Sequence, residues 1–346
     1  MIAISAVRTL VASALICATA AGCSGMPPTT AAPMSTPAMT TPSAATLLDA
    51  EFASLLRDYN DRNNLAIVAA NAGDLTAWKT ADTGVVLEGD LVFGLSGKHG
   101  TVSAFDFVPM RALADLRPDA GQRAIVGLVT SGPRGAATAS LTGSGSVGQS
   151  AGGTASVTAS PSSTMSDEGI VVFTQAAPGK PWLMRLHAGR PLSLPVAGAS
   201  RAPTAAEQAA VTEVASTAVA YLAGGTDTKG FDLDSIPRER GVLRNPWSAT
   251  SPQSSCSVDA GPYLAGIGER AVGVVEIHCR TVLHDKKGLS WKDDAARVWG
   301  NQSGKEINAY YAGTLVIEVG GDRPRVAWWG LRDGMSPDRL FAVAGL

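Results

Sequence analysis

The chain has few of the residues from which catalytic and metal sites are most often built. Its 346 residues include only four histidines and four cysteines, and aromatic side chains make up 5%. No histidines have the HExxH spacing of a zinc helix, no CxxC is present, and no GxSxG precedes a helical pattern. The glycine-rich stretch 142–153 is not followed by the Lys-Ser or Lys-Thr pair of a phosphate-binding loop. These absences argue against the common metal, serine-hydrolase and nucleotide-binding enzymes, and we expect neither a metal nor a cofactor.

An excess of charge of one sign is also missing. The chain carries 28 basic and 30 acidic side chains, a formal net charge of −2. Nucleic-acid-binding domains are usually strongly basic, so we expect no nucleic-acid partner. No apolar run reaches the roughly 20 residues that a membrane-spanning helix needs.

Cys23 is the most informative residue that is present. Arg8 is followed by the apolar run 10–20 and then by Ala-Ala-Gly-Cys at 20–23. This order resembles a bacterial lipoprotein signal, in which the cysteine becomes the lipid-bearing first residue of the mature protein. The resemblance implies a signal peptide over 1–22, acyl chains on Cys23 and anchoring on the outer face of the cell membrane. The alternative is a cleaved secretion signal without lipid, in which this cysteine is incidental.

The residues after Cys23 have the composition of a tether. Residues 24–45 are dominated by Pro, Thr, Ser, Ala and Met and include no charged side chain. Such a segment cannot bury enough apolar surface to offset the entropy of ordering it. We therefore expect residues 23–45 to be a flexible stalk between the lipid and the folded part.

The remaining cysteines agree with export from the cytoplasm. Cys17 lies in the signal segment, so only Cys256 and Cys279 remain in the folded part. Two such thiols in an oxidising compartment predict one disulfide, which stabilises by about 3 kcal/mol in the chain-entropy model. The alternative is a pair of buried free cysteines.

Two α+β domains are expected, over 46–197 and 198–346, with a possible duplication. Each half opens with an amphipathic helical pattern, at 48–59 and at 211–222. Thr204 and Glu207 form a capping box before the second helix, and Thr46 with Asp49 is a weaker version before the first.

The strand patterns of the two halves also correspond. Residues 169–186 and 314–331 each predict a strand, a Gly/Pro turn and a strand that carries tryptophan. Further strands are expected in both halves, at 105–108, 123–130, 271–283 and 307–312. The pattern predicts helices packed on one face of an antiparallel sheet. Between two strands of the first half lies a segment, residues 131–168, that is rich in Gly, Ser, Ala and Thr and predicts a disordered insertion. We expect residues 197–203 to be the linker between the two domains.

A family resemblance rests on the run at 59–64 (Tyr-Asn-Asp-Arg-Asn-Asn), on Leu75 and Trp78, and on the strand pair that ends at 181–182. These features resemble uncharacterised actinobacterial lipoproteins. The soluble part of those proteins is thought to consist of tandem cone-shaped domains similar to nuclear transport factor 2 and ketosteroid isomerase. The resemblance implies two cones, each with a helix packed on a curved antiparallel sheet, and it brings no established activity.

Candidate catalytic residues are few. Glu276 and His278 are two apart in an expected strand, so their side chains share a face, and a carboxylate beside an imidazole can prepare a general base. The alternative is a polar, solvent-facing side of the sheet, with Cys279 turned inward to Cys256. Asp106 is a second candidate, because ketosteroid-isomerase-like cones use a carboxylate base.

The aromatic residues suggest a binding surface. Most tryptophans and tyrosines lie in the second half, and the adjacent Trp328 and Trp329 must face opposite sides of their strand. Exposed aromatics favour recognition of proteins or sugars. The alternative is that they fill the core and an interdomain contact.

The sequence therefore favours a cell-envelope lipoprotein that acts as a non-catalytic binding module, with an envelope protein or a cell-wall glycan as partner. The alternative is a binder of small ligands, or an isomerase-like or dehydratase-like enzyme, in a cone pocket. That alternative predicts a deep apolar cavity lined by a few convergent polar groups. A third reading, a structural spacer, predicts neither a concave site nor exposed aromatics.

Overall fold

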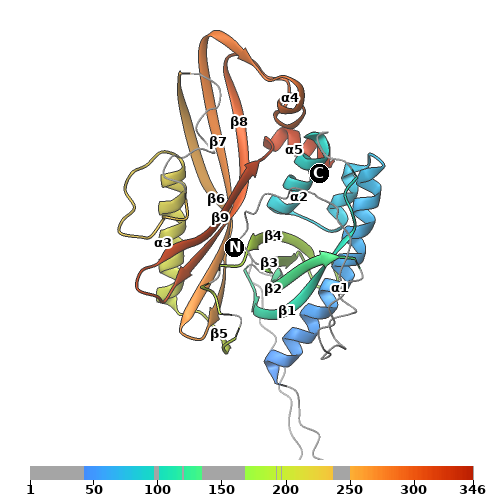
Figure 1. Ribbon diagram of the computed structural model, residues 1–346, viewed down its shortest axis with the longest axis vertical. Helices are drawn as coiled ribbons and strands as arrows, with labels where there is room; N and C mark the ends of the chain where they lie inside the picture. The colour runs from blue at the N-terminus through green and yellow to red at the C-terminus, as the bar shows by residue number, and fades with distance from the viewer. Residues whose placement is uncertain are drawn as a thin grey trace, which may run out of the picture. The chain divides into compact units, whose positions relative to one another are not determined.

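Two antiparallel sheets dominate the computed structural model (Figure 1). The structure describes residues 43–96, 101–118, 121–134, 168–191, 193–195, 197–236 and 250–345. The expected signal segment, Cys23 and the tether up to residue 42 lie outside the described residues, as do residues 135–167 of the expected insertion. The α+β class is confirmed, with helices beside two antiparallel sheets.

In the described residues of the first half, three helical segments come before four strands. The helical segments are α1 (Ala44–Asn71), the 3-10 helix η1 (Leu75–Thr80) and α2 (Gly84–Ser96). The strands are β1 (Phe105–Leu116), β2 (Arg123–Pro133), β3 (Glu168–Gln175) and β4 (Leu183–Gly189). They pair in the order β1-β2-β3-β4, so each strand lies beside the next one in sequence.

The second half repeats the order of a helix before a meander. Its helices are α3 (Ala205–Leu222), α4 (Asp293–Trp299) and α5 (Pro337–Ala344). Its strands are β5 (Ser200–Arg201), β6 (Thr250–Ile267), β7 (Arg270–Ser290), β8 (Ser303–Val319) and β9 (Arg325–Asp333). They pair in the order β5-β6-β7-β8-β9. The expected linker 197–203 contributes β5, which pairs with the end of β6.

Capping chemistry explains where the two long helices begin. The Thr204 hydroxyl accepts a hydrogen bond from the Glu207 N–H, and the Glu207 carboxylate accepts one from the Thr204 N–H, which confirms the expected capping box. The weaker capping box predicted at Thr46 and Asp49 is wrong. Ser43 caps α1 instead and accepts from the Thr46 N–H at 3.2 Å. The helix therefore starts before the expected domain boundary.

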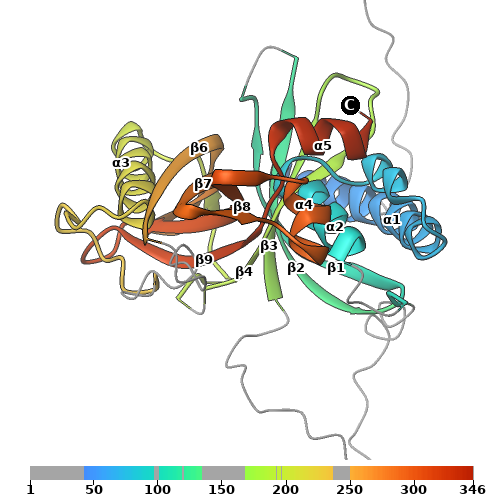
Figure 2. The ribbon, with the colours of Figure 1, turned by 90° about the horizontal axis from the view of Figure 1, so that it is seen from above.

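Each sheet has one face under a helix and the other against the second sheet. Helix α1 covers one face of the first sheet through Phe52, Leu56 and Tyr59. The opposite faces of the two sheets meet in a shared apolar cluster that includes Val172 from β3 and Val274 from β7. Viewed from above, the order is α1, first sheet, second sheet, α3 (Figure 2).

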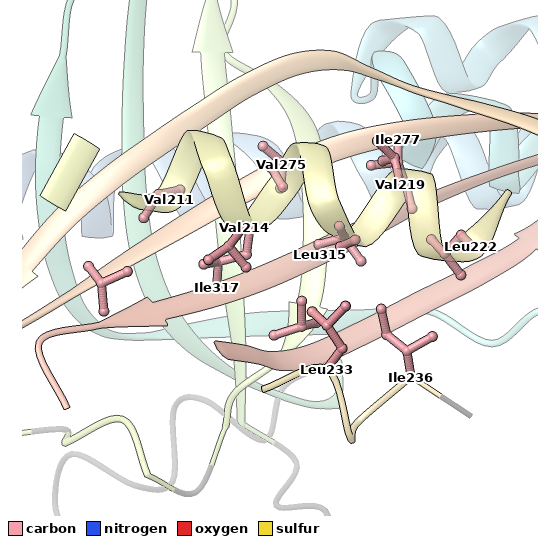
Figure 3. Packing of buried hydrophobic residues seen from close by; sticks show 14 of the residues in the cluster. Val211, Val214, Val219, Leu222, Leu233, Ile236, Val275, Ile277, Leu315 and Ile317 are labelled. Carbon is pink, nitrogen blue, oxygen red and sulfur yellow. The ribbon is translucent and has the colours of Figure 1, made fainter. Parts of the chain in front are cut away.

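Helix α3 packs on the outer face of the second sheet (Figure 3). Its valines and leucine point at alternate residues of β7 and β8, as the 3.6-residue period of a helix and the two-residue period of a strand require. The residues drawn include Val211, Val214, Val219 and Leu222 from the helix and Val275, Ile277, Leu315 and Ile317 from the strands.

In each half, a side chain of the covering helix packs directly over a glycine of the sheet. At Gly127 on β2 a Cβ would come within 2.2 Å of the Phe52 ring of α1. At Gly273 on β7, the second strand of the other meander, a Cβ would come within 2.4 Å of Val211 of α3. A side chain at either position would overlap a side chain of the helix, so the helix or that side chain would have to shift.

Asparagines of α1 bind the edge strand of the first sheet. The Asn60 amide bonds both the N–H and the carbonyl of Phe107, and the Asn64 amide does the same at Phe105. Asn71 repeats the pattern at Val102. Edge strands expose unpaired backbone groups, so these side chains take the place of a further strand.

The described residues of both halves belong to one compact unit. A further apolar cluster joins Leu91 of α2 to Trp291, Trp299 and Ile307 of the second half. The expected division at 197/198 falls between the two sheets, and the division of the chain into two domains there stays a prediction. None of the helices in the described part of the chain combines the length and the hydropathy that a membrane span requires.

Several elements were not expected from the sequence. Helix α2 was missed because it is apolar on nearly every side, so no periodic stripe marks it. Strand β6 was missed because its first part is rich in serine. The segments 307–312 and 314–319, expected as separate strands, are one continuous strand, β8.

Candidate functional site

A cavity of about 190 Å³ lies beside α1 in the first half. Its walls are largely aromatic and come from residues far apart in the sequence. They include Trp78 of η1, Phe93 of α2, Phe105 and Phe107 of β1, and His187 of β4. The His187 ring stands at 77° to the Phe107 ring with 5.2 Å between centroids. A flat apolar molecule fits such walls well.

Polar groups reach this cavity from α1, α2 and β9. Tyr59 and Asn63 are one helical turn apart on α1, and Asp90 is one turn after Val86 on α2. Arg332 enters from β9 of the second half. Its guanidinium lies against Gly89, where a Cβ would come within 2.7 Å of Nη1. The glycine beside Asp90 therefore makes room for the arginine.

Two carboxyls of the first half interact beside this cavity. Segment 81–83 pairs with Met184 of β4, which fixes Asp82 in the interior, and the Tyr59 hydroxyl donates to Asp82 Oδ1 at 2.9 Å. Burial raises the pKa of Asp82 well above its usual value, and the charge of Asp90 raises it further. Burial raises the pKa of Asp90 to about 7, although the charge of Arg332 and a hydrogen bond with Asp82 act to lower it.

The proton on Asp82 explains how the pair is arranged. Asp82 Oδ2 is buried and has no hydrogen-bond partner among the described residues. When Asp82 is protonated, it can donate to Asp90, which lowers the pKa of Asp90 and raises that of Asp82. Burial thus favours a proton shared by the pair, and the pKa of Asp90 is raised to about 7.

Besides Arg332, whose charge acts on Asp90, the cavity holds two further titratable groups, His187 and Tyr59, and both are neutral at pH 7. Burial, helped by the charge of Arg332, lowers the pKa of His187 to about 4. Burial and the charge of Asp82 raise the pKa of Tyr59 well above its usual value. The site thus offers neutral Tyr59 and His187 side chains and the Arg332 guanidinium around one carboxyl whose pKa is raised to about 7, which is an arrangement suited to hydrogen-bonding a ligand.

Asn63 is the polar group of the cavity that lacks a partner. Its side chain is 2% exposed, and its Nδ2 has no hydrogen bond to any residue that the structure describes. The amides of Asn60 and Asn64, on the same helix, are both satisfied by β1. A buried donor without an acceptor costs about 1–3 kcal/mol, so Asn63 marks a position where a ligand atom can bind.

The expected pair Glu276 and His278 lies elsewhere, where the two halves meet. The two side chains do share a face of β7, but the interpretation of that face as solvent-facing is wrong, because Glu276 is 2% exposed. Arg185 of β4 donates to Glu276 at 2.6 Å. Burial raises the pKa of Glu276, while the charges of Arg185 and His278 act against the rise.

His278 binds acidic groups on both sides. Its Nε2 lies 2.7 Å from Glu88 Oε2 of α2, and its Nδ1 lies 2.9 Å from Asp259 Oδ2 in a charge contact that is not an aligned hydrogen bond. Burial alone would lower the pKa of His278, but Glu88, Asp259 and Glu276 raise it above its usual value. Glu88 also accepts from the Met335 N–H. These contacts tie the two halves together and do not line the aromatic cavity.

The remaining expected site residues, Asp106, Trp328 and Trp329, are not among the residues that line the cavity. Asp106 accepts from Asn64 at 3.0 Å and belongs to the contact between β1 and α1, whereas its neighbours Phe105 and Phe107 line the cavity. Trp328 packs against the cluster between the sheets, and Trp329 against the cluster under α3. The two tryptophans therefore face opposite sides of β9, as expected.

The cysteines divide between the described and undescribed parts. Cys256 and Cys279 are opposite each other on β6 and β7, and a disulfide joins them. Cys23 lies outside the described residues. Within the described residues no three His, Cys, Asp or Glu side chains gather as a metal ion requires.

The cavity residues could have been suspected from one local signal. Helix α2 has the sequence GVVLEGDLVFGLS, in which Glu88 and Asp90 interrupt an otherwise apolar run. A helix that is apolar on nearly every side is usually buried, so charged side chains on it need partners, and buried carboxyls with shifted pKa values cluster at functional sites. The contributions of His187 and Arg332 carry no such signal, because only the fold brings them to α2.

A larger open groove of about 750 Å³ lies between the end of the β1–β2 hairpin, α3 and β6. Its lining is polar, and its arginines are engaged: Arg185 binds Glu276, and Arg117 binds Asp115 at 2.8 Å. The groove lacks the aromatic walls and the unpartnered buried donor of the smaller cavity.

No protein-family model, curated protein or solved structure matches this chain.

Proposed function

We propose that this chain is a cell-envelope lipoprotein that binds a small ligand, without catalysis, in the cavity beside α1. The observation that carries the proposal is the combination of aromatic walls with convergent polar groups, Asn63 and Asp90 above all. Cavities with this character are the usual sites of small-molecule binding. The site favours the pocket alternative over recognition through Trp328 and Trp329, which pack into apolar clusters.

Tandem cone-like domains of the kind found in actinobacterial lipoproteins form part of this proposal. Support comes from the matching order of a helix before an antiparallel meander of four successive strands, β1–β4 in the first half and β6–β9 in the second, where β5 pairs at the edge as a fifth strand. The helix rests on a glycine of the second meander strand in each case, Gly127 and Gly273. Such a correspondence is expected of a duplicated unit, in which each helix packs on its own sheet.

The proposal also includes attachment of the chain to the outer face of the cell membrane. It rests on the order of residues around Cys23, on the uncharged tether and on the pairing of Cys256 with Cys279. In this proposal the membrane is the partner of the lipid, and a tether lets the cavity sample ligands in the envelope.

Filling the cavity tests the binding function. Val86 lines the cavity, and we expect Val86→Trp to occupy it while leaving the sheets intact. Isothermal titration with ring-sized probes (toluene, indole and benzamide) should give binding to the wild-type chain and at least a tenfold weaker affinity for the variant.

The matched control is Val68→Trp, at a site on α1 that is 65% exposed and outside the cavity. It should bind the same probes as the wild type does. The proposal is wrong if no probe binds the wild-type chain, or if the control loses binding as fully as Val86→Trp.

A further inference from the structure

We propose that the ligand is a neutral, single-ring molecule whose polar group both accepts a hydrogen bond from Asn63 Nδ2 and donates one to the Asp90 carboxyl. A primary amide on an aromatic ring is the simplest example. This inference rests on the proposed function and goes further, because it names the chemical class that the cavity selects.

Size is the first argument. The cavity measures about 190 Å³. An apolar cavity of about 150 Å³ takes up benzene, so this one holds a single ring with a small substituent. The walls at Trp78, Phe105 and Phe107 present flat apolar surfaces to such a ring.

Hydrogen bonding is the second argument. Asn63 Nδ2 is a buried donor with no partner among the described residues, so the ligand must bring an acceptor. Asp90 is the carboxyl of the acidic pair that lines the cavity, so the ligand can bring a donor to it. A ligand with only an acceptor or only a donor leaves either the Asp90 carboxyl or Asn63 Nδ2 without a hydrogen bond. A buried polar group left in this way weakens binding strongly.

Charge is the third argument. A ligand anion would meet the Asp90 carboxyl, and a ligand cation would meet Arg332, whose charge already faces Asp90. His187 is neutral near pH 7 because burial lowers its pKa to about 4, and it offers no charge to either. A charged ligand would lose its hydration without gaining a free counter-charge.

Four probes of nearly equal shape test the inference on the full chain by isothermal titration at pH 7. Benzamide is neutral with both hydrogen-bonding functions, benzoate is an anion, benzylamine is a cation, and toluene has no hydrogen-bonding group. Benzamide should bind at least tenfold more tightly than each of the others. Asn63→Leu, which keeps the volume but removes the donor, should weaken benzamide binding about tenfold and leave toluene binding unchanged or stronger.

Glu213→Gln provides a matched control, because it alters an exposed carboxylate of α3 in the other half. It should bind all four probes as the wild type does. Equal affinities for benzamide and toluene, or tightest binding of benzoate or benzylamine, would overturn the inference while leaving the binding function in place. Failure of all four probes would instead refute the proposed function itself.

Discussion

At the scale of single residues, the acidic pair beside the cavity is the unusual feature. Asp82 and Asp90 lie close together in the interior, away from water. A proton shared between them lowers the free-energy cost of burying two carboxyl groups. Arg332 offsets part of what remains. The pair is therefore a source of pH-dependent stability as well as a place to bind a donor.

The Asp90→Asn variant should change the pH dependence of stability. The pKa of Asp90 is raised to about 7 in the fold, against roughly 4 in the unfolded chain, so its contribution is complete below about pH 4 and is lost as pH rises through 7. Asparagine stays neutral throughout. By calorimetry, we expect the variant to melt several degrees above the wild type at pH 8.5, and the difference to fall to near zero at about pH 4.

Groups whose pKa shifts do not involve Asp90, namely His187, His278 and Glu276, are present in both proteins and cancel in the comparison. The pKa of His187 is lowered to about 4, so its contribution is complete above about pH 6.5 and is lost as pH falls. The raised pKa values of His278 and Glu276 add losses as pH rises. An equal difference between wild type and variant at both pH values would show that Asp90 ionises normally.

At the scale of elements, the approach of a helix to a sheet is set by a missing side chain. The Phe52 ring occupies the space above Gly127, and Val211 occupies the space above Gly273. Protein interiors are packed too densely to absorb an additional methyl group without shifts. Each contact joins the long helix of one half to a glycine on the second strand of that half's meander. The two glycines therefore occupy corresponding positions, and the effects of substituting them can be compared directly.

Gly127→Ala and Gly273→Ala should each lower the free energy of unfolding by about 1–3 kcal/mol, because the added Cβ overlaps the helix side chain. Urea denaturation monitored by circular dichroism measures the effect. Gly321→Ala is the matched control, since a Cβ there meets nothing within 4 Å and no positive φ is required. A neutral result at both strand glycines would contradict this account of the helix–sheet contact.

At the scale of the whole molecule, contacts between the halves complete the site. Arg332 of the second half enters the cavity of the first, and Glu88 of the first half binds His278 and the Met335 N–H of the second. The Arg185–Glu276 pair adds a third link. A cavity assembled in this way depends on both halves, so neither half alone should hold the ligand site intact.

Anchoring is also a property of the whole chain. When the chain is produced in a bacterium that modifies lipoproteins, the mature protein should begin at Cys23 with acyl groups and fractionate with the membrane. Cys23→Ser should move the folded protein to the soluble fraction with its Cys256–Cys279 disulfide intact. Mass spectrometry of the N-terminal peptide decides the matter, and an uncut leader or a mature chain that begins after Cys23 would contradict the anchoring proposal.

The sequence by itself determined the features that depend on local periodicity and chemistry. The stripes at 48–59 and 211–222 predicted the two covering helices, and the box at Thr204 and Glu207 fixed the start of one of them. Alternation along β7 placed Ile277 and Cys279 on one face and Glu276 and His278 on the other, and the count of cysteines predicted the disulfide. Each of these inferences needs only neighbours in the chain.

Only the tertiary structure decided where the candidate site lies. Tyr59, Asp90, His187 and Arg332 are separated by tens of residues or more, and no spacing in the sequence links them. The sequence favoured Glu276 and His278, whose shared face proved to be buried between the halves, because burial on the second side of a sheet depends on what packs there. Raised or lowered pKa values and an unpartnered Asn63 arise from exclusion of water, and that requires the closed fold.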